Sequence, residues 1–202
     1  MNRKKDLVFF VFGIYFVLLG VLAVINAFNH PEIASPLWFC YIAVFLIGIG
    51  ILTQNSSLIA TQVNIMAIPI IFWNIDFFYH LITGSPLWGI TDYFFVGGVN
   101  SLGNFITLQH TYILPVSLVF IYIFGLNKKN LLKWSFLEIT LIFLASILLY
   151  PPAKNVNCVF SSCINFLSLG SPYYQILWFF SVFLMIFLTN SLLVYLIRKI
   201  RK

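Results

Sequence analysis

Charged residues are scarce in this sequence, and their scarcity decides the class of protein. Only 8% of the 202 residues are Asp, Glu, Lys or Arg, whereas about 25% is usual for a soluble domain. Hydrophobic residues make up 61% of the chain, and the mean hydropathy is +1.01. A surface of this composition could not face water. A soluble globular fold is therefore excluded, and we expect a single all-α domain, residues 1–202, embedded in a membrane.

The sequence also lacks the short motifs that would indicate a common activity. It has no His-Glu-x-x-His zinc motif and no Cys-x-x-Cys redox motif. The net charge of +6 could indicate a nucleic-acid partner. However, the basic residues lie in three short clusters at the ends of apolar runs, and no nucleic-acid-binding motif occurs. We therefore expect membrane lipid, not nucleic acid, as the surrounding partner.

Long apolar runs are abundant, and they predict six transmembrane helices. A spanning helix needs about 20 predominantly apolar residues. The predicted spans cover residues 7–28, 36–53, 58–83, 105–126, 132–150 and 174–197. The first run is longer than the apolar core of a signal peptide and is followed by no clear cleavage site, so we expect it to be retained.

The basic clusters predict how the chain is threaded. They precede the first span, separate the fourth from the fifth, and follow the sixth, and they hold all but one of the 11 Lys and Arg residues. With six spans, all three clusters lie on one side of the membrane. The positive-inside rule makes that side the cytoplasm, so both termini are expected there, in the cell (inner) membrane.

Two outer connections are long enough to carry function. Residues 84–104 mix aromatic, glycine and polar residues, and we expect them to form a partly ordered lid over the outer end of the bundle. Residues 151–173 contain Asn155, Asn157, Cys158 and Cys163. The two cysteines face an oxidising side, so a disulfide between them is predicted.

Ionisable residues inside the apolar runs indicate where polar chemistry would occur. Asp76 and His80 lie one helical turn apart in the third predicted span, and His110 lies at a similar depth in the fourth. Lipid cannot solvate a carboxylate, so these side chains should face the bundle. With Asp92 from the lid, they form a candidate outer cluster in which Asp76 binds His80 or His110.

Three interpretations of this outer cluster stay open. The polar residues could simply hold two helices together. Asp76, His80, Asp92 and His110 could ligate zinc or another divalent metal. Alternatively, an Asp–His pair could transfer protons as a catalytic base in a substrate pocket.

A second, inner set of polar residues is predicted near the cytoplasmic face. Asn64, Glu138 and the run Thr189–Ser191 should lie at similar depth. They could form a binding site for an ion or a proton in a carrier. Alternatively, they could only hold neighbouring helices together through hydrogen bonds.

These landmarks together resemble a poorly characterised prokaryotic multi-pass membrane protein family. The resemblance covers residues 73–160, and its pattern is an Asp, a Gly and Tyr loop, a His before a Pro, a Gly-plus-basic turn and a PP-x-x-N-[IV]-N loop. The matching residues are Asp76, Gly89, Tyr93, His110, Pro115, Gly125, Lys128, Pro151, Pro152, Asn155, Val156 and Asn157. The family often has an aromatic residue where this chain has Cys158. The resemblance implies a multi-pass membrane protein and no particular activity.

The leading functional prediction is acid–base chemistry on a lipid or small amphipathic substrate in an outward-facing pocket. Asp76, His80 and His110 would be catalytic, and Asp92, Tyr93, Asn155 and Asn157 would position the substrate. A small ion- or proton-coupled carrier and a structural or assembly subunit are the alternatives.

Overall fold

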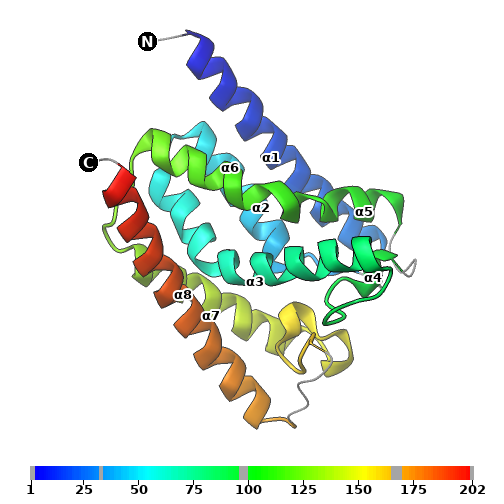
Figure 1. Ribbon diagram of the computed structural model, residues 1–202. Coiled ribbons are helices and arrows are strands. Elements are labelled where there is room, and N and C mark those ends of the chain that lie inside the picture. Colours follow the sequence, from blue (N-terminus) through cyan, green and yellow to red (C-terminus); the bar gives the residue numbers. More distant parts are fainter. Residues whose placement is uncertain (1–2, 32–33, 96–99, 165–169, 201–202) are drawn as a thin grey trace.

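The protein is all-helical, as Figure 1 shows for the computed structural model. The structure describes residues 3–31, 34–95, 100–164 and 170–200, and within these ranges it has no strand. The long helices are α1 (Arg3–Asn29), α2 (Phe39–Leu52), α3 (Ser56–Thr83), α6 (Gln109–Phe124), α7 (Leu131–Leu149) and α8 (Tyr173–Ile200). Shorter elements are α4 (Asp92–Phe95), α5 (Ser101–Thr107), η1 (Pro152–Lys154) and η2 (Val156–Cys158).

The predicted membrane spans are confirmed in part. Five helical segments of the described chain are long and apolar enough to cross a membrane: Lys5–Asn29, Ser56–Thr83, Ser101–Phe124, Leu131–Leu149 and Tyr173–Ile200. The second predicted span, 36–53, is shorter than expected, because α2 has 14 residues. At about 1.5 Å per residue, α2 is about 21 Å long and does not by itself cross a hydrocarbon core of about 30 Å.

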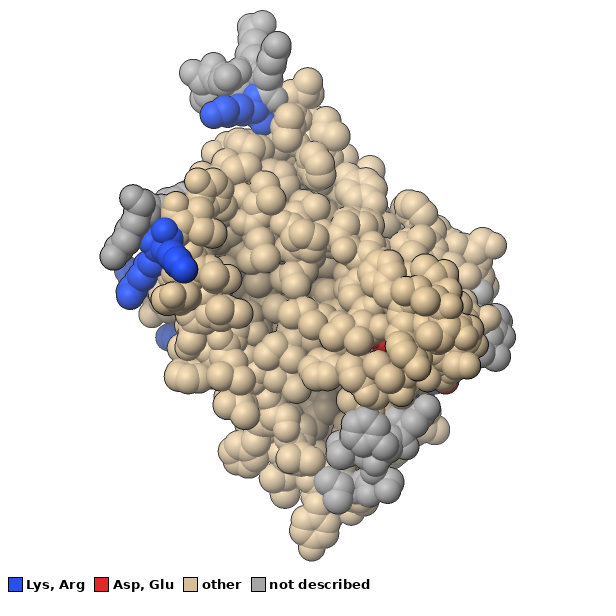
Figure 2. Space-filling view, viewed as in Figure 1, with Lys and Arg blue, Asp and Glu red and all other residues tan. Residues whose placement is uncertain are grey.

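Although α2 is short, it runs back towards the end of the bundle at which α1 starts. Both termini and the α6–α7 connection lie at the upper left of Figure 1, and the outer connections lie at the opposite end. On the face shown in Figure 2, the Lys and Arg side chains gather at the end where the termini lie. The predicted clustering of positive charge at one end of the bundle is therefore visible in the fold.

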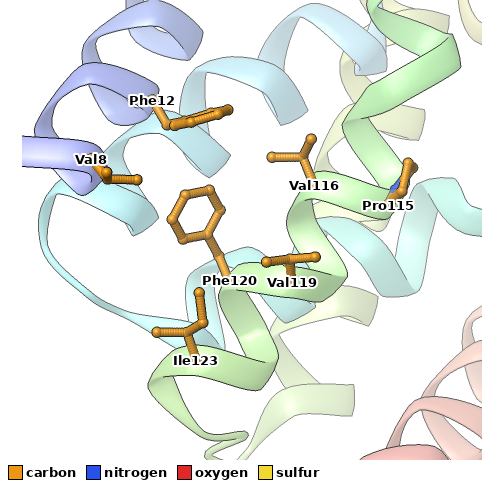
Figure 3. Close-up of a pocket in the computed structure, with 7 residues that line it drawn as sticks. All are labelled: Val8, Phe12, Pro115, Val116, Val119, Phe120 and Ile123. Carbon is orange, nitrogen blue, oxygen red and sulfur yellow. The ribbon is translucent and has the colours of Figure 1, made fainter. Parts of the chain in front are cut away.

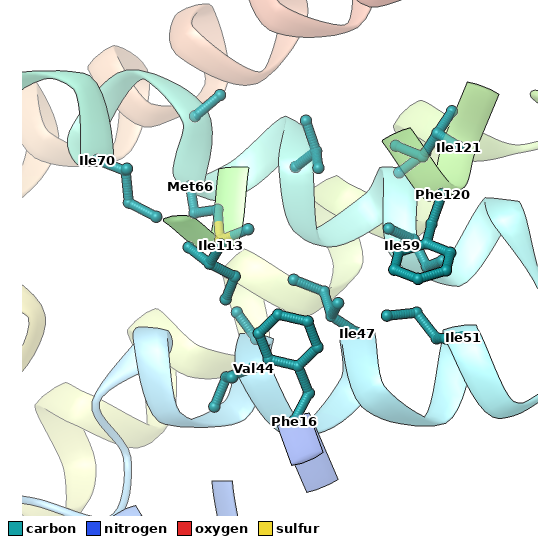
Figure 4. Close-up of a cluster of buried hydrophobic side chains, with 14 of the residues drawn as sticks. Phe16, Val44, Ile47, Ile51, Ile59, Met66, Ile70, Ile113, Phe120 and Ile121 are labelled. Carbon is teal, nitrogen blue, oxygen red and sulfur yellow. The ribbon is translucent and has the colours of Figure 1, made fainter. Parts of the chain in front are cut away.

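Helix α3 is the centre of the bundle. One large apolar cluster joins α3 to α1, α2 and α6, and Figure 4 shows Phe16, Ile47, Ile59 and Ile113 within it. A smaller cluster on the other side joins α3 to α7 and α8 through Ile65, Ile139 and Ile186. Because α3 is covered on both sides, most of its polar residues, among them Gln62, Asn64 and Asp76, are buried within the protein.

Close contact between α1 and α2 depends on glycine. A Cβ atom placed on Gly48 would lie 2.6 Å from the backbone nitrogen of Val17 and 2.8 Å from the carbonyl oxygen of Gly13. Small residues let helix backbones approach in this way, and the approach supplies the packing contacts that hold membrane helices together. The first two helices therefore form a tight pair against which α3 and α6 pack.

Candidate functional site

Asp76 binds the loop that follows its own helix. Gly84 ends α3 in the left-handed conformation, at φ 72°, and its N–H donates to the carbonyl of His80. The chain then turns back, and residues 84–91, the anchored loop, fold over the carboxylate. The N–H groups of Leu87 and Trp88 donate to Oδ1 over 3.1 and 2.7 Å. The N–H and hydroxyl of Thr91 donate to Oδ2 over 2.8 and 2.7 Å.

This arrangement corrects the predicted pairing of Asp76 with a histidine. The carboxylate is fully buried, and the four hydrogen bonds that the structure gives it all come from the anchored loop. The sequence predicted correctly that Asp76 faces inwards. Its partners could not be predicted, because three of the four donors are backbone groups of a loop. Asp76 thus holds the inner part of the predicted lid in place.

His110 is oriented by α5, α6 and α3. Its Nδ1 lies 2.6 Å from the carbonyl oxygen of Thr107, which can only accept a hydrogen bond. A neutral His110 therefore carries its proton on Nδ1, and its Nε2 keeps a lone pair. The ring stacks on Trp73 at 4.8 Å between centroids, with 25° between the planes. Within the described residues no hydrogen bond of Nε2 is found, and the His110 side chain is partly buried.

Tyr93 connects the lid to this histidine through Trp73. The indole Nε1 of Trp73 donates to the Tyr93 hydroxyl over 2.9 Å, and the same indole stacks on His110. Tyr93, Trp73 and His110 therefore form a continuous set, which we call the His110 cluster. Cys40, near the start of α2, is a free cysteine.

His80 and Asp92 form a second, looser pair at the lid. Nδ1 of His80 lies 3.8 Å from Oδ1 of Asp92, which is too long for a hydrogen bond. The His80 ring stacks on Phe95 at 4.0 Å. Among the described residues, no group of three or more His, Cys, Asp or Glu side chains is placed to hold a metal ion. The predicted four-residue metal set is therefore not assembled: Asp76 binds the loop, and His110 lies in a different cluster.

The two asparagines of the outer loop have protein partners. Asn157 accepts from the N–H of Phe39 (2.8 Å) and donates to the carbonyl of Leu37 (2.8 Å) and to Ser146 Oγ (3.1 Å). It thereby caps the start of α2, which has no side-chain cap of its own. Asn155 accepts from the N–H groups of Phe160 and Ser161. Their predicted part in substrate binding remains a prediction, and the structure gives both a local structural role.

The same outer loop contains the predicted cysteine pair. The sulfur atoms of Cys158 and Cys163 lie at bonding distance, and their Cα atoms are 5.7 Å apart. This separation lies within the usual range for a disulfide. Lys154, the basic residue of the outer side, bonds the carbonyl of Pro31 and so ties this loop to the α1–α2 connection.

The predicted inner polar residues meet between three helices. Nδ2 of Asn64 on α3 donates to Ser135 Oγ on α7 and to Asn190 Oδ1 on α8, each over 3.2 Å. Nε2 of Gln62 donates to Glu138 Oε2 over 2.9 Å. Gln62 was missed from the sequence, although a glutamine two residues before Asn64 in a buried span was a usable signal. Ser191, by contrast, bonds only its own helix.

An apolar groove lies between α1 and α6, away from both polar clusters. Figure 3 shows its lining, and its volume is about 290 Å³. All of its lining residues are apolar: Val8, Phe12, Pro115, Val116, Val119, Phe120 and Ile123. The groove offers no group that could donate or accept a proton, so it is not the reactive centre.

Comparison with family models, curated proteins and solved structures finds no match to this chain.

Proposed function

We propose that this protein performs acid–base chemistry on a lipid or small amphipathic substrate, with His110 as the proton acceptor. One observation carries the proposal. The contact between Nδ1 and the Thr107 carbonyl fixes the tautomer of His110, so that Nε2 keeps its lone pair. A histidine held by a carbonyl at one ring nitrogen and free at the other is the usual arrangement of a general base.

The surroundings of His110 suit proton transfer. Stacking on Trp73 fixes the plane of the imidazole, so Nε2 points in one direction and needs little reorganisation during a reaction. The adjacent residue, Gln109, is fully buried, and neither its amide oxygen nor its amide nitrogen has a hydrogen-bond partner among the described residues. This amide therefore keeps an unused donor and an unused acceptor inside the bundle.

In this proposal Asp76 has a positioning role rather than a catalytic one. Its four bonds hold the anchored loop over the outer end of α3. Tyr93 then reaches Trp73 from the lid helix α4. Water is excluded by such a cover, which strengthens electrostatic interactions inside the site. Asp92 and His80 lie on the same cover and are proposed to contact the substrate as it enters.

The atom that His110 activates is proposed to be the oxygen of a water molecule that stays under the cover. Through Nε2, the histidine would remove a proton from this attacking oxygen and return it to the leaving group.

We also propose that the protein lies in the cell (inner) membrane with both termini in the cytoplasm. The clustering of basic side chains at the end that holds both termini supports this orientation. It places the His110 cluster towards the outer leaflet. Fusion of a fluorescent protein that folds only in the cytoplasm to the C-terminus should give a bright signal. A periplasmic phosphatase at the same position should be inactive; the reverse pattern would overturn the orientation.

Lipid conversion by the purified protein tests the proposed chemistry. Wild-type protein would be placed in nanodiscs made from a total polar lipid extract, and lipid species would be followed by mass spectrometry. His110→Asn is the matched variant, because its amide nitrogen can still bond the Thr107 carbonyl while Nε2 is lost. We expect conversion of at least one lipid class by wild type and a loss of about 100-fold or more in His110→Asn. No conversion by wild type, or equal conversion by the variant, would refute acid–base chemistry by His110.

A further inference from the structure

The polar residues at the inner end of the bundle are bonded to one another but leave oxygen atoms unused. We call Gln62, Asn64, Ser135, Glu138 and Asn190 the inner polar cluster. Three acceptors in it are buried without a hydrogen-bond partner among the described residues: Gln62 Oε1, Asn64 Oδ1 and Glu138 Oε1. Gln62 is 0% exposed and Asn64 is 1% exposed, so water outside the bundle cannot reach these oxygens. Buried polar atoms are nearly always bonded, so three together require an explanation.

The residues that carry the three oxygens are linked to each other through α7. Gln62 is bonded directly to Glu138. Asn64 is bonded to Ser135, which precedes Glu138 by three residues and lies on the same face of α7. Neighbouring residues on a helix face are about 5–6 Å apart. The hydrogen bonds and the turn of α7 therefore join the residues that carry the three oxygens into one network.

The chemistry of the cluster selects a cation. All three free atoms are acceptors, while the side-chain nitrogens of Gln62 and Asn64 and the hydroxyl of Ser135 are already donating. Glu138 has no ion-pair partner among the described residues, and the ammonium of nearby Lys133 lies over the ring of Trp134. A carboxylate in an apolar bundle needs compensation of its charge.

We propose that the inner polar cluster is a binding site for a monovalent metal cation, Na⁺ or K⁺. The carboxylate of Glu138 supplies the one negative charge, and the amide oxygens of Gln62 and Asn64 supply neutral ligands. A divalent ion would leave an excess positive charge in the bundle, which low-dielectric surroundings disfavour. Oxygen ligands of this kind coordinate Na⁺ and K⁺ in membrane proteins. The site is independent of His110, so its failure would leave the proposed chemistry untouched.

Thermal unfolding in different salts tests the site. Wild-type protein in detergent would be unfolded in NaCl, KCl and choline chloride at equal ionic strength. We expect Tm to be about 5 °C higher in saturating NaCl or KCl than in choline chloride. The salt with the larger effect identifies the ion. Equal Tm values in all three salts would overturn the proposal and leave a bound water or a protonated Glu138 as the explanation.

Two variants and a direct measurement complete the test. Glu138→Gln keeps the shape of the side chain and removes its charge, so the cation dependence of Tm should disappear. Ser191→Ala lies next to Asn190 but outside the cluster, and it should keep the full dependence. An unchanged dependence in Glu138→Gln would refute the assignment. If that variant does not fold, the binding of radioactive ²²Na⁺ to wild-type protein, and its displacement by K⁺, test directly whether a monovalent cation is bound. Absence of saturable binding would also overturn it.

Discussion

Thr91 is bound to Asp76 twice: its backbone N–H and its hydroxyl both donate to Oδ2, over 2.8 and 2.7 Å. Thr91 and Asp76 are both fully buried, although Thr91 belongs to a connection between helices. A carboxylate that accepts several backbone N–H groups is an anchor for the segment that supplies them. The outer cover of the bundle therefore depends on one buried acid in α3.

Replacing Asp76 with Asn should open the anchored loop. One carboxylate oxygen becomes an NH₂ group, which faces N–H donors and leaves at least one of them unpaired in a buried place. We expect a loss of about 3 kcal/mol in the free energy of unfolding, with faster amide hydrogen exchange at residues 84–91. Asp92→Asn is the control, because the Asp92 side chain is 41% exposed and makes no hydrogen bond at 3.8 Å. Unchanged exchange in Asp76→Asn would show that the loop is held by other contacts.

Gly48→Ala should weaken the α1–α2 pair. The new Cβ would lie 2.6 Å from the backbone nitrogen of Val17, so the helices must move apart. Overpacking of this kind costs about 1–3 kcal/mol, and thermal unfolding in detergent would measure it. Gly170→Ala is the matched control, because nothing lies within 4 Å of its added Cβ. Equal stability of the two variants would contradict the close packing at Gly48.

Asn157→Gly should loosen the start of α2. Glycine tolerates the φ of 56° at this position, so the variant removes only the side-chain bonds to Phe39, Leu37 and Ser146. We expect a loss of about 2 kcal/mol, since a helix cap and two further bonds disappear. Asn130 has a similar φ of 58° and no side-chain capping bond, so Asn130→Gly should change stability by less than about 0.5 kcal/mol. A smaller effect at position 157 than at position 130 would refute the capping role.

The pairing of the cysteines can be checked by counting the thiols that react with an alkylating reagent. If Cys158 and Cys163 are bonded and Cys40 is free, denatured and unreduced protein should take up one alkylating group per chain, and reduced protein should take up three. Closing so short a loop stabilises the fold by about 2 kcal/mol in the chain-entropy model, so reduction should lower Tm. Three labels without reduction would show that the pair is not oxidised in the purified protein.

The overall helical architecture was predictable from the sequence because hydropathy reports directly on burial in lipid. The long apolar runs predicted the helices. The positions of the basic clusters predicted that consecutive helices run in opposite directions. The length of α2 was not predictable, because it starts only at Phe39, where the side chain of Asn157 from a distant loop caps it. A contact between residues 118 positions apart leaves no local pattern in the sequence.

The candidate site was predictable only as a set of residues, not as a set of contacts. Asp76 and His110 could be placed at one depth, since helical rise is constant. Their partners are the backbone of residues 87–91 for Asp76 and the carbonyl of Thr107 for His110. Backbone groups occur at every position, so no residue type marks them in advance. Hydrogen bonds between two polar side chains were easier to predict. Asn64 and Asn190, which were predicted at similar depth, are hydrogen bonded to each other.

The protonation of the His110 ring tests the account most directly. The protein has three histidines, so nitrogen-15 labelling of histidine gives a simple NMR spectrum, and His110→Asn assigns the signal that disappears. At a pH of about 8, where free histidine is neutral, we expect a proton on Nδ1, bonded to Thr107, and an unprotonated Nε2. A spectrum in which Nε2 of His110 carries the proton would contradict the account, because no lone pair would then be free to accept one from a substrate.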